Sequence, residues 1–140
     1  MPVLTESLHY KMSGDSQIEN ITQSLQDTIS KSGLHSGTLT VFVKHTTASV
    51  MIIEDEPGIR NDTIRIWDQL IPADPSWSHN TTNPGEDNGH SHLRGQLQGP
   101  SITIPFVNQA LTLGTWQQIV LIDFDTRSRT REVILQMIGE

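Results

Sequence analysis

The residues best suited to chemistry lie in the segment 89–101, where two histidines stand one residue apart and an arginine follows two residues later. If the first half of this segment is extended, His90, His92 and Arg94 share one face, because side chains alternate along a strand. Two neutral imidazoles and a fixed cation on one surface suit a metal ion, an anion or both. On this segment alone, a polar loop end with two solvated histidines is the favoured interpretation.

A second polar group follows the predicted strand 38–44. His45 lies at the carboxyl end of that strand and continues the face of its aliphatic residues. Thr46, Thr47 and Ser49 place three hydroxyl groups beside it. Hydroxyls next to an imidazole at a strand end are candidates for holding a substrate.

Four histidines are candidates to converge on a metal ion: His45, His79, His90 and His92. Glu54, the first of three consecutive acidic residues, is a candidate carboxylate support. Zinc and similar divalent ions bind imidazole well, and three protein ligands with one open position is the catalytic arrangement. The spacing of these histidines is not a local metal-binding signature. The spacing by itself therefore favours the alternative, which is that the four histidines are unrelated.

Positive charge in this acidic chain is confined to few positions, of which the notable ones are Lys44, Arg94, Arg127, Arg129 and Arg131. Cations and hydroxyls together hold phosphate groups in proteins. For the last three arginines, which alternate and point the same way if extended, pairing with surface carboxylates is an equally good interpretation. For Arg94, which adjoins the histidines, a functional role in anion binding is favoured.

Length and composition limit the classes of protein. A chain of 140 residues predicts one domain, residues 1–140, while an apolar content of only 34% indicates a lean core or a surface completed by partner subunits. The net charge of −7 argues against general nucleic-acid binding, and the absence of cysteine excludes disulfides and thiolate metal sites. With no signal peptide and no apolar run of membrane-spanning length, the expected location is the cytoplasm.

The order of elements predicts an α+β fold with mainly antiparallel sheet in a β-sandwich and two principal helices. The expected strands are 3–12, 38–44, 50–53, 102–106, 111–113, 119–124 and 133–138. The first helix begins at a capping box, Ser16 with Glu19, and ends at Ser32. The second begins near Pro57.

Three further expectations concern particular segments. The buried stripe of the second helix is Ile59, Thr63, Ile66, Trp67 and Leu70. The segment 72–91 has no periodicity, and a loop of that length is usually functional or disordered; its tryptophan weighs against disorder. Trp116, in the turn 114–117, either plugs the core or a subunit interface or lines a pocket.

The chain resembles the YjbQ-like family, which is named for a secondary thiamine-phosphate synthase activity. The residues that carry the resemblance are His45-Thr46-Thr47-Ala48-Ser49, Glu54 with Pro57 and Asp62, Trp77-Ser78-His79, Ser91-His92-Leu93, Gly99-Pro100-Ser101, Gly114-Thr115-Trp116-Gln117 and Gly139-Glu140. The resemblance covers residue 2 to the end. It implies a small α+β fold, a homotrimer, and a His-rich pocket for a divalent metal ion, zinc or magnesium, and a small phosphorylated metabolite.

The resemblance also suggests roles for individual residues. His45, His79 and His92 are the expected metal ligands, and His90 has no counterpart in the family. The expected catalytic residues are His45, His92 and Arg94, and the expected substrate-binding residues are Thr46, Thr47, Ser49, Glu54 and Trp116. The implied activity joins a pyrimidine diphosphate to a thiazole phosphate. A non-catalytic metal- or phosphometabolite-binding trimer and a metal-dependent phosphate-ester hydrolase remain as alternatives.

Overall fold

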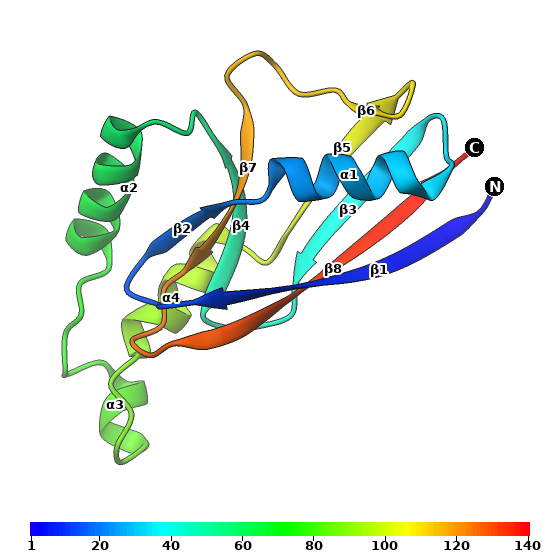
Figure 1. Ribbon diagram of the computed structural model, residues 1–140. Coiled ribbons are helices and arrows are strands. Elements are labelled where there is room, and N and C mark those ends of the chain that lie inside the picture. The colour runs from blue at the N-terminus through cyan, green and yellow to red at the C-terminus, as the bar shows by residue number, and fades with distance from the viewer.

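The computed structural model describes all 140 residues and combines two antiparallel sheets with four helices (Figure 1). The strands are β1 (Val3–Met12), β2 (Gln17–Asn20), β3 (Gly37–Val43), β4 (Ala48–Ile53), β5 (Ser101–Val107), β6 (Ala110–Leu111), β7 (Gln118–Asp123) and β8 (Arg129–Gly139). The helices are α1 (Thr22–Ser32), α2 (Pro57–Leu70), α3 (Ser78–Thr82) and α4 (Gly89–Gln98). This confirms the predicted α+β class. None of the helices is long and apolar enough to cross a membrane.

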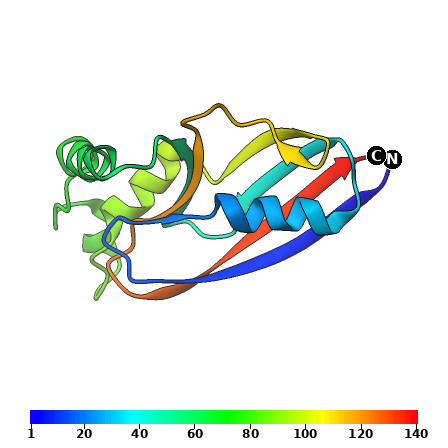
Figure 2. The ribbon, with the colours of Figure 1, turned by 45° about the horizontal axis from the view of Figure 1, so that its top comes forward.

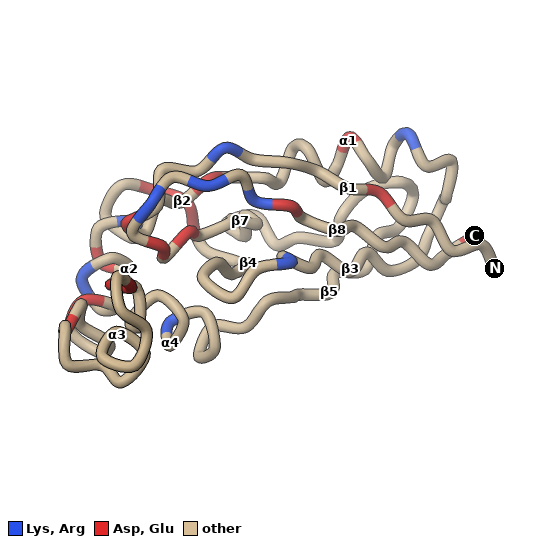
Figure 3. Tube along the Cα trace, turned by 90° about the horizontal axis from the view of Figure 1, so that it is seen from below, with Lys and Arg blue, Asp and Glu red and all other residues tan.

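The larger sheet has the strand order β1-β8-β3-β5-β6 and the smaller one β2-β7-β4. The two ends of the chain lie together at one end of the molecule, where β1 and β8 pair, while α2, α3 and α4 gather at the other (Figures 1 and 2). Lysines and arginines lie mostly along β1, β8 and the helical end, where acidic residues are interspersed with them (Figure 3). No face of the trace is purely basic.

The main core lies between the two sheets and beneath α1. Leu39 and Val41 of β3, on the face that alternation predicts, are fully buried together with Leu121 of β7. Leu25 and Ile29 of α1 cover the same cluster. Burying each of these side chains contributes roughly 1.5–3 kcal/mol relative to exposure, so this cluster holds β3 and β7, and with them the loops at their ends.

The apolar residues 119–122 of β7 are covered on both faces of the strand, as is typical of a continuous apolar stretch in a central strand. Val120 and Ile122 face away from the main core and pack in a second cluster with Trp67 of α2. The ring of Phe124 meets Trp67 edge-on, with 5.1 Å between centroids. The small sheet is therefore buried on both sides and rigidly supports the residues that follow β7.

The capping-box prediction was wrong about where the first helix begins. The helix starts at Thr22, and the residues before it form β2, in which Ile18 pairs with Ile122. Ser16 is buried in a left-handed conformation with φ 65°, and so is not a helix cap. In this pairing Ile18 is buried in the same cluster as Trp67. The predicted end of the helix is confirmed, since Gly33 has φ 77°.

The second helix begins as predicted, with the carboxylate of Glu56 accepting hydrogen bonds from the N–H groups of Gly58 and Ile59. Its predicted buried stripe is wrong except for Trp67. Ile66 and Leu70 are 54% and 59% exposed. The three strands that α2 covers are only four to six residues long, and they bury little more than the tryptophan.

The most consequential difference between the predicted and the observed structure concerns the segment that carries His90, His92 and Arg94. It is the helix α4, not a strand, and the preceding segment contains the short helix α3, so it is not one long loop. On a helix, positions two apart point in nearly opposite directions, while positions four apart share a face. His90 and Arg94 therefore lie together on the buried face, and His92 points away from them.

Candidate functional site

The site lies at the loop that carries the chain from β3 in the larger sheet to β4 in the smaller one. Helix α4 packs directly on this loop at Gly95, where a Cβ atom would stand 2.7 Å from the carbonyl oxygen of Thr46. The hydroxyl of Ser49 donates to the Gly95 carbonyl at 3.4 Å. A glycine here lets the helix backbone approach the loop closely. This contact sets His45 and Thr46 opposite His92.

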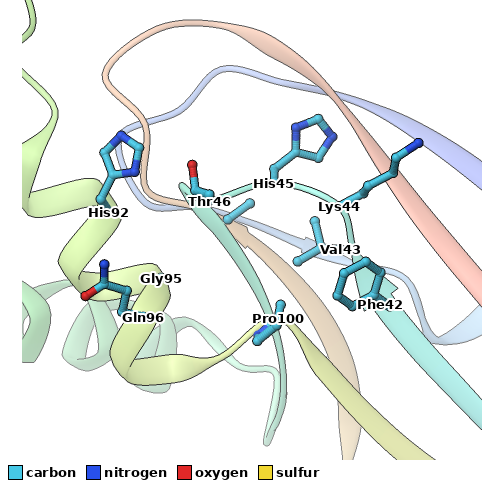
Figure 4. A pocket seen from close by; sticks show the side chains of 10 residues that line it. Phe42, Val43, Lys44, His45, Thr46, His92, Gly95, Gln96 and Pro100 are labelled. Carbon is cyan, nitrogen blue, oxygen red and sulfur yellow. The ribbon is translucent and has the colours of Figure 1, made fainter.

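Two adjoining hollows open at this contact and share His45, Thr46 and His92. The first, the apolar hollow, has a volume of about 680 Å³. Its further lining residues are Phe42, Val43, Lys44, Ala48, Gly95, Gln96 and Pro100. Figure 4 shows Thr46 between His92 and His45, above Val43, Phe42 and Pro100.

The second, the polar hollow, has a volume of about 330 Å³ and no hydrophobic lining residue. Its further lining residues are Thr47, His79, Glu86, Asn88, Asp125, Arg129 and Arg131. A space with an apolar half and a polar half suits a ligand that has a ring at one end and a charged group at the other.

His45 is held by one hydrogen bond. Its Nε2 atom accepts from the backbone N–H of Glu132 at 2.9 Å. Burial lowers the pKa of the imidazole, and the nearby Arg131 guanidinium lowers it further, against the opposing effect of Asp123. The ring is therefore neutral at pH 7, with a fixed orientation at the boundary of the two hollows.

A buried ionic network forms the floor of the polar hollow. Arg131 donates to both carboxylate oxygens of Asp123, from Nε at 2.8 Å and from Nη2 at 2.6 Å, and also to the Thr47 hydroxyl at 2.8 Å. Both members of the Arg131–Asp123 pair have at most 1% of their side chain exposed. The charge of Arg131 is thus matched by Asp123, and the pair fixes Thr47 in place.

Asp125 lies at the centre of that network. Burial by itself raises its pKa, but hydrogen bonds from the Thr126 N–H, the Thr47 hydroxyl, the Asn88 amide and Arg129 outweigh burial and lower the pKa to about 2. The carboxylate is therefore ionised throughout the physiological range. It orients Arg129, whose Nε donates to it at 2.6 Å.

Arg129 is the cation of this hollow that is most available to a ligand. Its side chain is 45% exposed, and only its Nε has a hydrogen-bond partner in the protein. The remaining donors of a guanidinium can bind an anionic oxygen in a planar, bidentate manner. Arg127, by contrast, lies outside both hollows and donates to the carbonyl oxygen of Gly85 at 3.3 Å.

Two of the four histidines lie against each other. The rings of His79 from α3 and His92 from α4 have centroids 4.5 Å apart. Burial lowers the pKa of His92, and the neighbouring His79 lowers it further. Two imidazoles this close fit two positions in the coordination shell of a divalent ion. No three of the chain's His, Asp and Glu side chains are grouped in a metal-binding arrangement.

Other candidate residues lie elsewhere. Arg94 is 3% exposed, and its Nε and Nη2 both donate to the carbonyl oxygen of Ile71, at 2.9 and 2.7 Å. His90 is also buried, and its Nδ1 has no hydrogen-bond partner. Glu54 follows the far end of β4, and Trp116 is 71% exposed on the loop before β7. None of these four lines either hollow.

Four further residues at or beneath the polar hollow were not predicted from the sequence: Glu86, Asn88, Asp123 and Asp125. The two aspartates and the following arginines form one alternating run, Asp123 to Arg131, immediately after the central strand. A charged residue at every second position, first two aspartates and then three arginines, was the available signal. It indicated a common face, but which arginine is buried and which is exposed depends on the segments that pack against each of them.

Comparison with known proteins agrees with this architecture. The sequence model of the family described as UPF0047 protein YjbQ-like matches residues 6–140. A UPF0047 protein of Methanothermobacter thermautotrophicus is 32% identical over 140 residues, covering 100% of this chain and 95% of the relative. The UPF0047 protein YugU of Bacillus subtilis is 29% identical over 137 residues, covering 97% and 100%.

Solved structures show the same fold. A YbjQ-like protein of unknown function from Sulfolobus solfataricus P2 superposes with a TM-score of 0.92 at 27% identity, covering 99% of each chain. A hypothetical protein from Aeropyrum pernix K1 superposes with a TM-score of 0.90 at 34% identity, covering 98% of this chain and 99% of the other. With a family match over nearly its whole length and relatives of this similarity, the chain belongs to the UPF0047, or YjbQ-like, family.

Proposed function

We propose that this protein binds a small phosphorylated metabolite with a flat ring in the two joined hollows. The observation that carries the proposal is their adjacency: an apolar space of about 680 Å³ and a polar space of about 330 Å³ are both lined by His45, Thr46 and His92. The ring of such a ligand would lie against Phe42 and Pro100. Its phosphate would lie beside Arg129.

The reaction that we propose for this site is slow formation of thiamine phosphate. A thiazole nitrogen attacks the methylene carbon of a pyrimidine diphosphate, the bond from that carbon to oxygen breaks, and diphosphate leaves with the electron pair. Such a reaction depends on positioning and on charge stabilisation at the leaving group, without a protein nucleophile. Arg129 supplies the charge, while Thr46 and His45 can supply neutral donors.

A divalent metal ion, zinc or magnesium, is part of the proposal. His79 and His92 would hold it, because their rings are adjacent and His92 borders both hollows. The ion would supply positive charge close to the diphosphate. Because the chain offers only these two grouped ligands, the substrate or water would complete the coordination shell.

A second function, binding without catalysis, is favoured by the charge balance of the polar hollow. Arg131 is neutralised by Asp123, and Arg129 is partly neutralised by Asp125. Glu86 adds a further negative charge to the lining. A site with so little uncompensated positive charge would stabilise a departing diphosphate weakly, and the thiamine activity would then be incidental to binding.

The decisive assay uses untagged protein from a host that lacks its own thiamine-phosphate synthase, which removes the obvious contaminant. We expect product in the presence of a divalent ion, and a rate lowered roughly tenfold to a hundredfold in Arg129→Ala, since the arginine is partly solvent-exposed. Arg127→Ala, in the same segment but outside the hollows, is the matched control. Absence of product, or equal rates in the two variants, would contradict the catalytic proposal.

Metal content is a separate measurement. We expect elemental analysis of the untagged protein to find a divalent metal, which His92→Ala should lose. His9→Ala, at an exposed histidine of β1, is the control for nonspecific binding. Equal metal content in the His92→Ala and wild-type proteins would remove His92 from the metal site.

A further inference from the structure

The hydrogen bond to His45 determines which ring nitrogen carries the proton. A backbone N–H can only donate, so Nε2, which receives the N–H of Glu132 at 2.9 Å, must present its lone pair. A neutral imidazole has one protonated nitrogen, and here it is Nδ1. The lowered pKa of His45 agrees with a ring that remains neutral at pH 7.

The sheet itself fixes this arrangement. Lys44 N–H donates to the Glu132 carbonyl at 3.2 Å, and Val43 is in register with Val133, so β3 pairs with β8 up to this point. In an antiparallel pair, the N–H and C=O of one residue point to the same side. The N–H of Glu132 therefore points toward the chain at the place where it leaves β3. There the His45 ring accepts the hydrogen bond that a backbone carbonyl of β3 would accept if the strand continued.

A metal ion requires an imidazole nitrogen with a free lone pair. In His45, the lone pair of Nε2 is used by Glu132, and Nδ1 carries a proton. Ligation through Nε2 would require the ring to release the N–H of Glu132, and ligation through Nδ1 would require a change of tautomer that places an Nε2–H against that N–H. Either route leaves a backbone N–H without its partner. Such an unpaired donor is costly when it is shielded from water. His79 and His92 have no such constraint.

We infer that His45 donates its Nδ1–H to an anionic oxygen of the ligand and is not a metal ligand. The chemical class of that oxygen is phosphoryl or carboxylate. His45 borders both hollows, so its donor would meet the ligand where the apolar and polar halves join, with Thr46 beside it and Arg129 further into the polar half. The identity of the anion rests on the proposed function, whereas the tautomer and the exclusion of metal do not.

The first measurement is a long-range ¹H–¹⁵N NMR spectrum of the imidazole rings in the untagged wild-type protein, with His45 assigned from the missing signals of His45→Gln. We expect the Nδ1-protonated pattern for His45. Titration with Zn²⁺ should perturb the rings of His79 and His92 directly and leave the tautomer of His45 unchanged. An Nε2-protonated His45, or conversion of its ring on addition of Zn²⁺, would overturn the inference.

Two variants separate the two nitrogens of the ring. His45→Asn places an amide near the position of Nδ1 and can still donate to the ligand, whereas His45→Gln places one near Nε2 and can only replace the contact with Glu132. We expect His45→Gln to weaken the binding of pyrophosphate about tenfold or more, and His45→Asn to weaken it less. Zn²⁺ affinity should be equal in both variants and the wild type. Circular dichroism should show that both variants are folded.

The probes are pyrophosphate and oxalate, which present phosphoryl and carboxylate oxygens. If the protein binds oxalate but not pyrophosphate, and His45→Gln weakens oxalate binding, the donor role is supported and the proposed phosphorylated ligand is contradicted. Loss of Zn²⁺ affinity in His45→Gln would contradict the inference and leave the proposed function standing. A His45→Gln variant that binds both anions as the wild type does would contradict the donor role.

Discussion

Arg94 provides the sharpest test of how α4 is held in place. Its side chain is 4% exposed, and it makes two hydrogen bonds to the carbonyl oxygen of Ile71 and one, at 3.3 Å, to the hydroxyl of Ser16. Its ion pair with Asp68 spans 3.1 Å, but the Asp68 side chain is 65% exposed. The guanidinium therefore links α4 to the end of α2 and to the turn before β2, with no donor directed to either hollow.

Replacement by alanine should destabilise the fold by about 3 kcal/mol. Hydrogen bonds from a charged group are worth roughly 1.5–3 kcal/mol, and the half-buried carbonyl of Ile71 would lose both of its side-chain donors. The exposed pair with Asp68 adds about 0–1 kcal/mol. For a chain of this length, about 3 kcal/mol corresponds to a fall in Tm of roughly 10 °C.

The assay is urea unfolding and thermal unfolding of the wild type and Arg94→Ala at one fixed protein concentration, because assembly makes stability depend on concentration. The control is Arg65→Ala, which removes an exposed ion pair with Asp62 and should change stability by less than about 0.5 kcal/mol. Pyrophosphate affinity is measured in parallel. Unchanged stability together with lost pyrophosphate binding in Arg94→Ala would refute the structural role and return Arg94 to the anion site.

Three further predictions concern pH, packing and assembly. Asp125 has a pKa of about 2 in the fold and about 3.9 when unfolded, so its contribution to stability, about 2.6 kcal/mol, is present above about pH 4 and is lost as the pH falls toward 2. Asp125→Asn should flatten this part of a plot of Tm against pH, and an unchanged slope would contradict it. Gly95→Ala should push α4 away from Thr46, which should lower the free energy of unfolding in urea by about 1–3 kcal/mol and weaken pyrophosphate binding. Leu97→Ala, at an exposed position of the same helix, should change neither. Light scattering should give about three times the chain mass of 15.6 kDa, as a closed cyclic trimer requires, and a monomer at micromolar concentration would contradict the proposed trimer.

Local sequence patterns determined most of the framework. The alternation of Leu39 with its polar neighbours placed β3 correctly, because a strand with one buried face requires that period whatever it pairs with. Asn108 and Gln109 form the turn between the strands predicted at 102–106 and 111–113, with φ 52° and 61°, and asparagine is among the residues that tolerate left-handed backbone. His45 was correctly placed at a strand end, and the family resemblance pointed to Thr46 and His92 beside it.

The tertiary structure decided what those residues can do. The segment from Gly89 to Gln98 contains three histidine and arginine side chains that suit a strand face equally well, but in the structure it is a helix that packs closely on the loop at Thr46. This helix buries Arg94 and brings His92 to the hollows. Likewise, the proton position on His45 depends on the N–H of Glu132, 87 residues later in the chain. Charge and hydrogen-bonding capacity can be read from residue type, but which partner satisfies them is set by contacts between distant segments.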